Sequence, residues 1–214
     1  MIFAAAPSQN ELLAELRAAP DILWPRIEAF HMDEYQGLLA EAPQRFSNFL
    51  RRALFDHVSL QAAHLIDTQG LAIEDEMRRY AALLEQAPID LVCLGIGENG
   101  HIAFNDPPVD FADPLPIKQV ELDEACRRQQ VNDGAFPSLE MVPRRAVTLT
   151  VPALMRGESL CCVVPGERKA AAVNAMLAGP VNGACPASVL RRHPDCTLYL
   201  DAESAALWLA GLPA

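Results

Sequence analysis

Three groups of polar side chains each follow a short apolar run, and each carries residue types that can move protons or hold an anion. Asp33 follows the run at residues 26–31, where a carboxylate can act as a base. His101 and Asp106 lie in the loop after the next buried run, and the imidazole can exchange protons near neutral pH while the carboxylate orients it. Lys169 lies at a third such turn, where a point charge beside a helix N-terminus suits a phosphate. Together these groups predict proton transfer on a small anionic molecule.

Each group also has an ordinary structural explanation. Asp33 can cap a solvated turn, His101 and Asp106 can form a structural hydrogen bond, and Lys169 can be one of the exposed basic residues at a helix start. If the sheet is parallel, however, Asp33 and His101 share one edge of it, because open α/β sheets gather ligand-binding residues at the carboxyl ends of their strands. On the residue types alone, both explanations stay open.

The histidine-containing loop also spells a dinucleotide-binding pattern. Gly95, Gly97 and Gly100 match G-x-G-x-x-G after an apolar strand, but that pattern requires a helix to continue past its third glycine. The prolines at positions 107 and 108 end any helix within two turns. The sequence therefore predicts no nicotinamide or flavin site. Instead, glycines such as Gly97 let the backbone approach a substrate closely.

Apolar runs alternate with helical patterns along the chain, which is typical of an α/β fold in one domain. The continuous apolar run at residues 89–94 resembles a strand buried on both faces of a parallel sheet. We expect a mostly parallel sheet with helices on both faces. The expected strands are residues 1–6, 26–31, 89–94, 146–150, 159–164 and 197–200, and the expected helices are residues 8–17, 43–55, 71–85, 167–177 and 202–210.

Composition limits the classes of partner and location. The 214 residues carry a formal charge of −11, which argues against a protein that coats nucleic acid or anionic lipid. No apolar stretch is long enough to span a membrane, and the N-terminus lacks the basic region of a secretory signal. The six cysteines contain no C-x-x-C pair, so we expect reduced thiols in a cytoplasmic protein and neither a disulfide framework nor a structural metal.

Three segments resemble the glucosamine-6-phosphate deaminase/isomerase family. They are FHMDEYQGL at residues 30–38, LGIGENGHIAFNDP at residues 94–107 and PGERKA at residues 165–170, in the family's order and spacing. Weaker similarity continues through residues 181–183 and 193–194, so the resemblance covers nearly the whole chain. It implies a three-layer, Rossmann-like α/β fold, no metal or organic cofactor, and conversion of glucosamine 6-phosphate and water to fructose 6-phosphate and ammonia.

The resemblance also implies roles for individual residues. Asp33 would be the base that moves the proton between C2 and C1 of the sugar. His101 would assist ring opening, with Asn99 and Asp106 as its orienting partners. Lys169 would hold the phosphate.

The remaining substrate contacts are expected in two loops. The resemblance assigns phosphate binding to the first strand-to-helix loop, which here includes Ser8 and Gln9. Gly97 is the expected point of backbone contact in the histidine-containing loop. Exposed helix N–H groups plus one lysine can hold a dianion without a basic surface.

Four features depart from the family pattern. The first loop lacks the usual pattern rich in glycine and Ser/Thr, and Asp106 stands where Glu is more frequent. Asn132 occupies the aligned position of a phosphate-binding arginine, although Arg127 and Arg128 lie nearby and could substitute. The family also places a helix before its first strand. We therefore predict a single isomerase/deaminase domain over residues 1–214 without that helix.

Other functions remain as alternatives. A 6-phosphogluconolactonase-type hydrolase would share the fold and a Gly-His loop but would not need Asp33 as a base. A non-catalytic sugar-phosphate-binding relative would have lost its catalytic acids, and galactosamine 6-phosphate is an alternative substrate. A homo-oligomer is a further alternative on which the sequence is silent.

Overall fold

The computed structural model describes residues 1–70 and 72–212, and a six-stranded, wholly parallel sheet forms its centre. Its spatial order explains why residues far apart in sequence meet, since the strand nearest the N-terminus lies in the middle of the sheet. The strands in order across the sheet are β4 (Ala62–His64), β2 (Glu28–His31), β1 (Ile2–Phe3), β5 (Leu91–Leu94), β8 (Ser159–Val164) and β9 (Cys196–Leu200).

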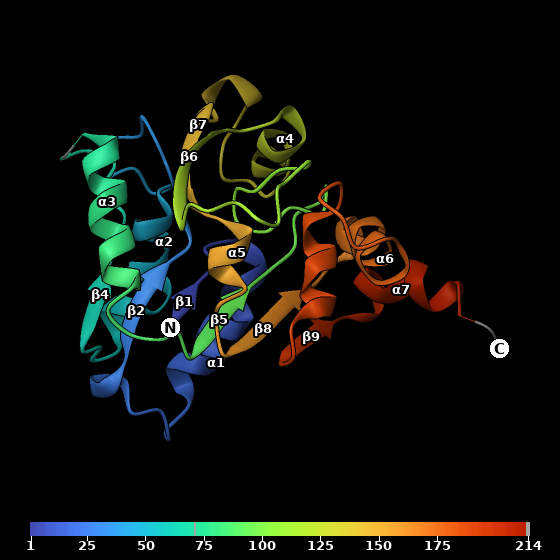
Figure 1. The fold of residues 1–214 in the computed structure, drawn as a ribbon, viewed down its shortest axis with the longest axis horizontal. Coiled ribbons are helices and arrows are strands. Elements are labelled where there is room, and N and C mark those ends of the chain that lie inside the picture. Colours follow the sequence, from blue (N-terminus) through green and yellow to red (C-terminus); the bar gives the residue numbers. More distant parts are fainter. Residues whose placement is uncertain (71, 213–214) are drawn as a thin grey trace.

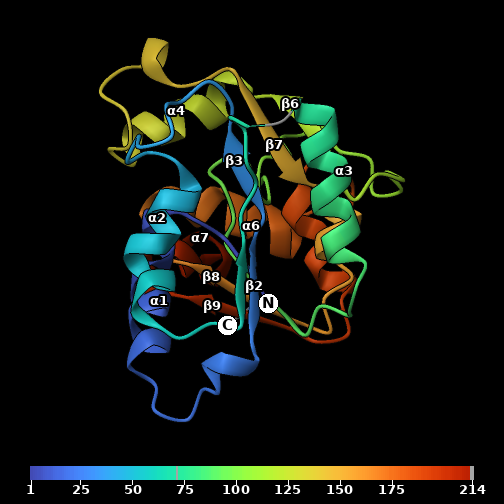
Figure 2. The same cartoon turned by 90° about the vertical axis from the view of Figure 1, so that its left-hand side faces the viewer.

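Strand side chains alternate between two apolar layers, as the period of two requires. Phe3 and Cys93 pack toward helices α1 (Asn10–Ala18) and α2 (Phe46–Ala53). Ile2, Val92 and their neighbours pack toward α3 (Ile73–Leu84), α5 (Val151–Leu154) and α6 (Ala170–Ala178). Figure 2 shows α1 and α2 on one side of β2 and α3 on the other. The expected α/β fold with helices on both faces is confirmed.

A second, three-stranded antiparallel sheet stands beyond one end of the main sheet. It consists of β3 (Asp33–Tyr35), β7 (Arg145–Leu149) and β6 (Ile117–Glu121), with β7 in the middle. Helix α4 (Glu124–Asn132) packs with it around a cluster that includes Tyr35 and Phe104. Figure 1 shows β6, β7 and α4 grouped above the main sheet.

Several predicted boundaries were wrong. The first strand covers only Ile2–Phe3, and the 3₁₀ turn Pro7–Gln9 precedes α1. The predicted helix 43–55 begins at Phe46, since residue 45 has extended backbone. The strand expected at residues 146–150 is β7, so it belongs to the antiparallel sheet and not to the parallel one. The predicted start of the third helix at residue 71 lies outside the described residues.

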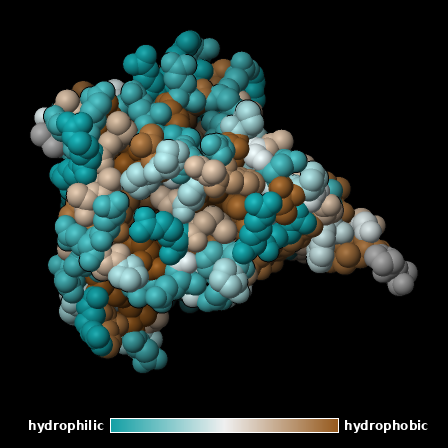
Figure 3. Space-filling view, viewed as in Figure 1, coloured by the Kyte–Doolittle hydropathy of each residue, from teal (hydrophilic) through white to brown (hydrophobic). Residues whose placement is uncertain are grey.

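The last helix and the surface complete the molecule. Helix α7 (Ala202–Ala210) begins with a capping box between Asp201 and Ser204 and packs against α6. Among the described residues, no helix has the length and apolar character needed to cross a membrane. Hydrophilic side chains are interspersed with smaller apolar areas on the face seen in Figure 3.

Candidate active site

A cleft lies where the carboxyl ends of β1, β2, β5 and β8 face the second sheet. Its volume is about 510 Å³ including the open mouth. Six of the eight residues predicted as site residues line it, although they come from four separate segments of the chain. These six are Ser8, Gln9, Asp33, Gly97, His101 and Lys169. The other two, Asn99 and Asp106, lie behind His101 and contact it or its backbone.

Asp33 occupies the junction between the two sheets. A single residue, Met32, separates β2 from β3; its N–H donates to Phe3 O (3.2 Å), and its carbonyl accepts from the Leu149 N–H (2.7 Å). Asp33 follows directly, paired with Thr148 in the antiparallel sheet and almost fully buried. Burial, aided by the neighbouring Glu34, raises the pKa of the Asp33 carboxyl well above its ordinary value. Asp33 is therefore a stronger base than an exposed aspartate.

The next residue, Glu34, is equally buried but has a different environment. Its carboxylate accepts hydrogen bonds from the Phe46 and Ser47 N–H groups, both at 3.0 Å, and from the Ser47 hydroxyl at 2.6 Å. Arg45 Nε lies 3.5 Å away. These donors belong to the first turn of α2, where exposed N–H groups and the helix dipole favour an anion. Glu34 thus fixes the start of α2, whereas Asp33 faces the cleft.

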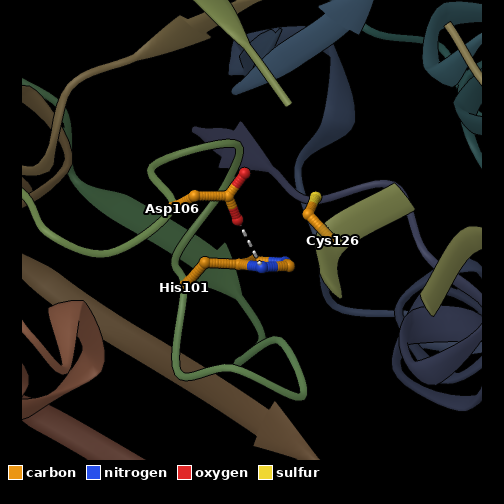
Figure 4. A group of neighbouring side chains, drawn as sticks. All are labelled: His101, Asp106 and Cys126. Carbon is orange, nitrogen blue, oxygen red and sulfur yellow. Dashed lines mark ion pairs between the residues drawn. The ribbon is translucent and has the colours of Figure 1, made fainter. Parts of the chain in front are cut away.

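The catalytic-type histidine is held by a network of amide and carboxylate groups. Asn99 Oδ1 accepts from the His101 N–H (3.1 Å), and Asn99 Nδ2 donates to Asp106 Oδ1 (3.1 Å). His101 Nδ1 lies 3.2 Å from the same Asp106 oxygen (Figure 4). Asp106 Oδ2 accepts from the Asp123 N–H (3.1 Å). We call residues 97–106, with these contacts, the histidine loop.

Asp106 remains ionised in this network. Burial acts to raise the pKa of its carboxyl, but the His101 ring, the Asn99 amide and the Asp123 N–H together outweigh burial. The pKa of Asp106 is therefore below its ordinary value. An anion on the Nδ1 side of His101 leaves the opposite ring nitrogen as the one available for exchange with a ligand.

Gly97 contributes to this arrangement in a way the sequence did not indicate. A Cβ at this position would overlap the His101 ring, and the Gly97 N–H donates to His101 O at 2.9 Å. The lack of a side chain at Gly97 therefore leaves space for the His101 imidazole. Gly100 takes a φ of +84°, which closes the turn between them.

The other end of the cleft, which we call the lysine end, holds Ser8, Gln9 and Lys169. The Gln9 Nε2 group donates to Val163 O (3.1 Å) and Ser8 Oγ (3.3 Å). Its Oε1 atom is buried without a hydrogen-bond partner among the described residues. Lys169 is 8% exposed, and within the described residues its ammonium makes no ion pair or hydrogen bond. Burial lowers the pKa of Lys169, and the negative charges of Asp133 and Glu98 act to raise it.

The nearby arginines are engaged elsewhere. Arg127 donates to the carbonyls of Leu139 and Val142, and Arg128 pairs with Glu124. Neither lines the cleft, so in the described part of the chain neither takes the position of the missing arginine. Within the part of the chain that the structure describes, Lys169 is the one cation lining the cleft.

Two polar residues of the cleft were not predicted from the sequence. Gln129 and Gln130 come from α4, and their side-chain oxygens accept from the Glu98 N–H (2.8 Å) and the Tyr35 hydroxyl (2.7 Å) respectively. The available signal was the helix start, since Asp123 caps α4 by accepting from the Cys126 N–H. The helix has few apolar positions, so its periodicity was weak.

Comparison with known proteins gives concordant similarities. Residues 7–108 match the family model described as glucosamine-6-phosphate isomerases/6-phosphogluconolactonase. The chain is 38% identical over 182 residues to proteins named glucosamine-6-phosphate deaminase from Bacillus thuringiensis (strain Al Hakam) and Bacillus cereus (strain AH820). In each case the match covers 85% of this chain and 68% of the relative.

Solved structures extend the similarity to three dimensions. A monomeric glucosamine-6-phosphate deaminase of the NagB superfamily superposes with a TM-score of 0.83 at 29% identity, covering 96% of this chain and 87% of that one. A 6-phosphogluconolactonase from Thermotoga maritima gives a TM-score of 0.70 at 20% identity, covering 93% and 83%. The latter similarity concerns the fold alone.

Proposed function

The chain belongs to the family of glucosamine-6-phosphate isomerases and 6-phosphogluconolactonases, and we propose that it acts as an amino-sugar-phosphate deaminase/isomerase. The substrate would be glucosamine 6-phosphate, which with water gives fructose 6-phosphate and ammonia. The observation that carries this proposal is one cleft that combines a buried carboxylate, Asp33, with an oriented histidine, His101, and a lysine, Lys169, that has no partner among the described residues.

Asp33 suits the proton transfer between sugar carbons. Moving a proton from C2 to C1 requires a base that lies within reach of both atoms and whose conjugate acid returns the proton. The raised pKa of Asp33 brings the two protonation states closer in free energy at neutral pH, as a general acid–base catalyst requires. Its place on two hydrogen-bonded strands holds it rigidly.

His101 suits the opening of the sugar ring. Its free ring nitrogen can exchange a proton with the ring oxygen or the anomeric hydroxyl, while Asp106 and Asn99 hold the ring from behind. These two residues would act as positioning residues and not as groups that touch substrate.

The lysine end would hold the phosphate. Lys169 supplies one positive charge, and Ser8 supplies a hydroxyl from the 3₁₀ turn that precedes α1. Because a buried ammonium without a partner is costly, an incoming anion recovers part of that free energy on binding. A single local cation is compatible with the net charge of −11, since a phosphate bound inside a cleft is governed by its nearest groups.

The direct test is purified protein with glucosamine 6-phosphate, assayed for both ammonia and fructose 6-phosphate. We expect equimolar release of the two products, and an Asp33→Ala control should give none above background. Absence of both products with the wild-type protein would reject the proposal.

Parallel substrates separate the alternatives. Hydrolysis of 6-phosphogluconolactone without ammonia release from the amino sugar would identify a lactonase, and preference for galactosamine 6-phosphate would reassign the sugar. Calorimetric binding of sugar phosphate without turnover would identify a non-catalytic relative. Light scattering during size-exclusion chromatography tests the homo-oligomer alternative; the similar deaminase structure is described as monomeric.

A further inference from the structure

A cysteine lies against the catalytic-type histidine, and neither the proposed reaction nor the relatives' names give it a role. Cys126, in the first turn of α4, is 1% exposed. Its Sγ, a nitrogen of His101 and a carboxylate oxygen of Asp106 all lie within 4.8 Å of one another. Figure 4 shows the three side chains converging from the histidine loop and from α4.

Within this cluster, His101 has a ring nitrogen that is free to bind a metal ion. Nδ1 of His101 is buried and makes no aligned hydrogen bond among the described residues, although Asp106 Oδ1 is 3.2 Å away. The side chains of His101 and Asp106 are 8% and 10% exposed. A buried imidazole nitrogen without a properly aligned partner is uncommon, because the loss of hydration is then uncompensated.

The local field favours a cation at this place. The carboxylates of Asp106, Asp123 and Asp33 lie close enough to the Cys126 thiol for their negative charges to act on it. The same three carboxylates that oppose a thiolate attract a metal ion, which in turn stabilises the thiolate. Asn99 Nδ2 donates to both Asp106 (3.1 Å) and Asp123 (3.3 Å), so the carboxylates are held in place.

We propose that His101, Asp106 and Cys126 form an inhibitory binding site for a thiophilic divalent cation, with Zn²⁺ as the best fit. One nitrogen, one oxygen and one sulfur donor suit zinc, whereas Mg²⁺ and Ca²⁺ prefer oxygen donors alone. Metal–ligand bonds of about 2.0–2.3 Å in a tetrahedron place the ligand atoms about 3.5 Å apart. The three ligand atoms here lie within 4.8 Å of one another, so small side-chain movements would bring them to that spacing.

Binding would proceed without redox chemistry. The Cys126 S–H bond breaks, its proton leaves to solvent, and the thiolate, imidazole and carboxylate bind the cation, with water in the fourth position. The metal would hold the His101 ring and take the Asp106 carboxylate from it. The inhibitory consequence rests on the proposed function, whereas the binding itself does not.

Binding is tested first, on metal-stripped full-length protein. Titration with ZnCl₂ by calorimetry should show one equivalent bound, and Co²⁺ should give a thiolate-to-metal charge-transfer band. Cys126→Ser should remove the band and weaken Zn²⁺ binding at least tenfold. The matched control, Cys196→Ser in β9, should leave both measurements unchanged, and MgCl₂ should give no binding heat.

Inhibition is tested second. Zn²⁺ should inhibit the wild-type deaminase reversibly, with recovery on chelation, and the inhibitory concentration should rise at least tenfold for Cys126→Ser relative to that variant's own uninhibited rate. If the protein shows no deaminase activity, the binding measurements still decide whether the site exists.

The outcomes against the site are specific. No bound zinc, no cobalt–thiolate band, or a Cys126→Ser variant that binds zinc as the wild type does would each overturn it. Thermal melting checks that each variant is folded. If Cys126→Ser does not fold, Cys126→Ala and His101→Asn remove different donor atoms, and zinc binding equal to wild type in either would reject the site.

Discussion

The two ends of the cleft differ in how their polar groups are satisfied before any ligand arrives. In the histidine loop, the Asn99 side chain makes three hydrogen bonds and the Asp106 carboxylate accepts two, whereas the His101 Nδ1 atom, 3.2 Å from Asp106, makes no aligned hydrogen bond among the described residues. At the lysine end, Lys169 and Gln9 Oε1 are buried without partners among the described residues. Groups that orient a catalytic side chain are bound in advance, whereas groups that meet a ligand are left free to meet it.

Asp33 is one of the groups left free to meet a ligand, although the carboxylate of the neighbouring Glu34 is hydrogen-bonded within the protein. Glu34 is bonded to the first turn of α2, while Asp33 points into the cleft with its charge disfavoured. Consecutive side chains on a strand point to opposite faces. Glu34 therefore stabilises the start of α2, whereas Asp33 faces the cleft.

The largest expected effect comes from removing the proposed base, Asp33. Asp33→Asn keeps the size of the side chain but cannot accept the proton, so we expect kcat to fall by about 10³-fold, within the range of general-base contributions. In the wild type, kcat/KM should decrease toward acid at a pH above the ordinary aspartate range, because burial raises the Asp33 pKa and the ionised form is the active one. An unchanged rate in Asp33→Asn would remove it from the reaction.

A smaller loss is expected from crowding the histidine. Gly97→Ala would displace the His101 ring, and a displacement of about 1 Å can reduce kcat about 10²-fold. Substrate KM should change little, since the lysine end is untouched. Gly211→Ala, where a Cβ meets only ordinary contacts at 3.5 Å and beyond, is the control. Equal kinetics in the two variants would contradict the tight packing of ring against glycine.

At the lysine end, the expected effect is on binding. Lys169→Met removes one charge-assisted hydrogen bond, of about 1.5–3 kcal/mol, so KM should rise about 10- to 100-fold with a smaller change in kcat. Arg168→Met is the matched control, because the Arg168 side chain is 58% exposed and pairs with Glu98 and Asp133. A KM that responds to Arg168 and not to Lys169 would reverse the assignment.

The smallest effects concern stability, and the two neighbouring acids should respond in opposite directions. The folded state raises the Asp33 pKa, so ionisation opposes folding once the pH exceeds the unfolded value near 3.8. Asp33→Asn should therefore be more stable than wild type at pH 7, and the gain should vanish toward pH 4. Glu34→Gln should lose about 1–3 kcal/mol, which is about 2–12 °C in Tm.

Urea unfolding at several pH values measures both effects. Two variants that shift the midpoint in the same direction at pH 7 would mean that the contrast between Asp33 and Glu34 is not electrostatic. The comparison needs no substrate, so it is independent of the proposed reaction.

The sequence located the chemical groups better than their surroundings. Asp33, His101 and Lys169 were found because polar residues directly after apolar strands must lie at one edge of a parallel sheet. The antiparallel sheet was missed, since pairing of β3 with β7 joins residues more than 100 positions apart and leaves no local pattern. Gln129 and Gln130 were missed with it, because α4 is placed by that sheet.

The arginines show the same limit of prediction from sequence, which is that the direction of a side chain depends on contacts in space. Arg127 and Arg128 were suitable by type and position, but a helix turns each residue to its own direction, and only contacts in space decide which faces the cleft. Gly97 was predicted to be a point of close approach for a substrate; in the structure the His101 ring packs against it, and contact with a substrate stays a prediction.

The one-residue connection at Met32 has a consequence for how the protein would lose activity on heating. Its backbone is tied to β1 on one side and to β7 on the other, so Asp33 keeps its position only while the two sheets stay registered against each other. A slip of the antiparallel sheet would displace Asp33 while the parallel sheet stayed folded. Under the proposed mechanism, loss of activity on heating before the parallel sheet unfolds would therefore report on the contacts between the two sheets. Substitutions that strengthen those contacts should raise the temperature of inactivation.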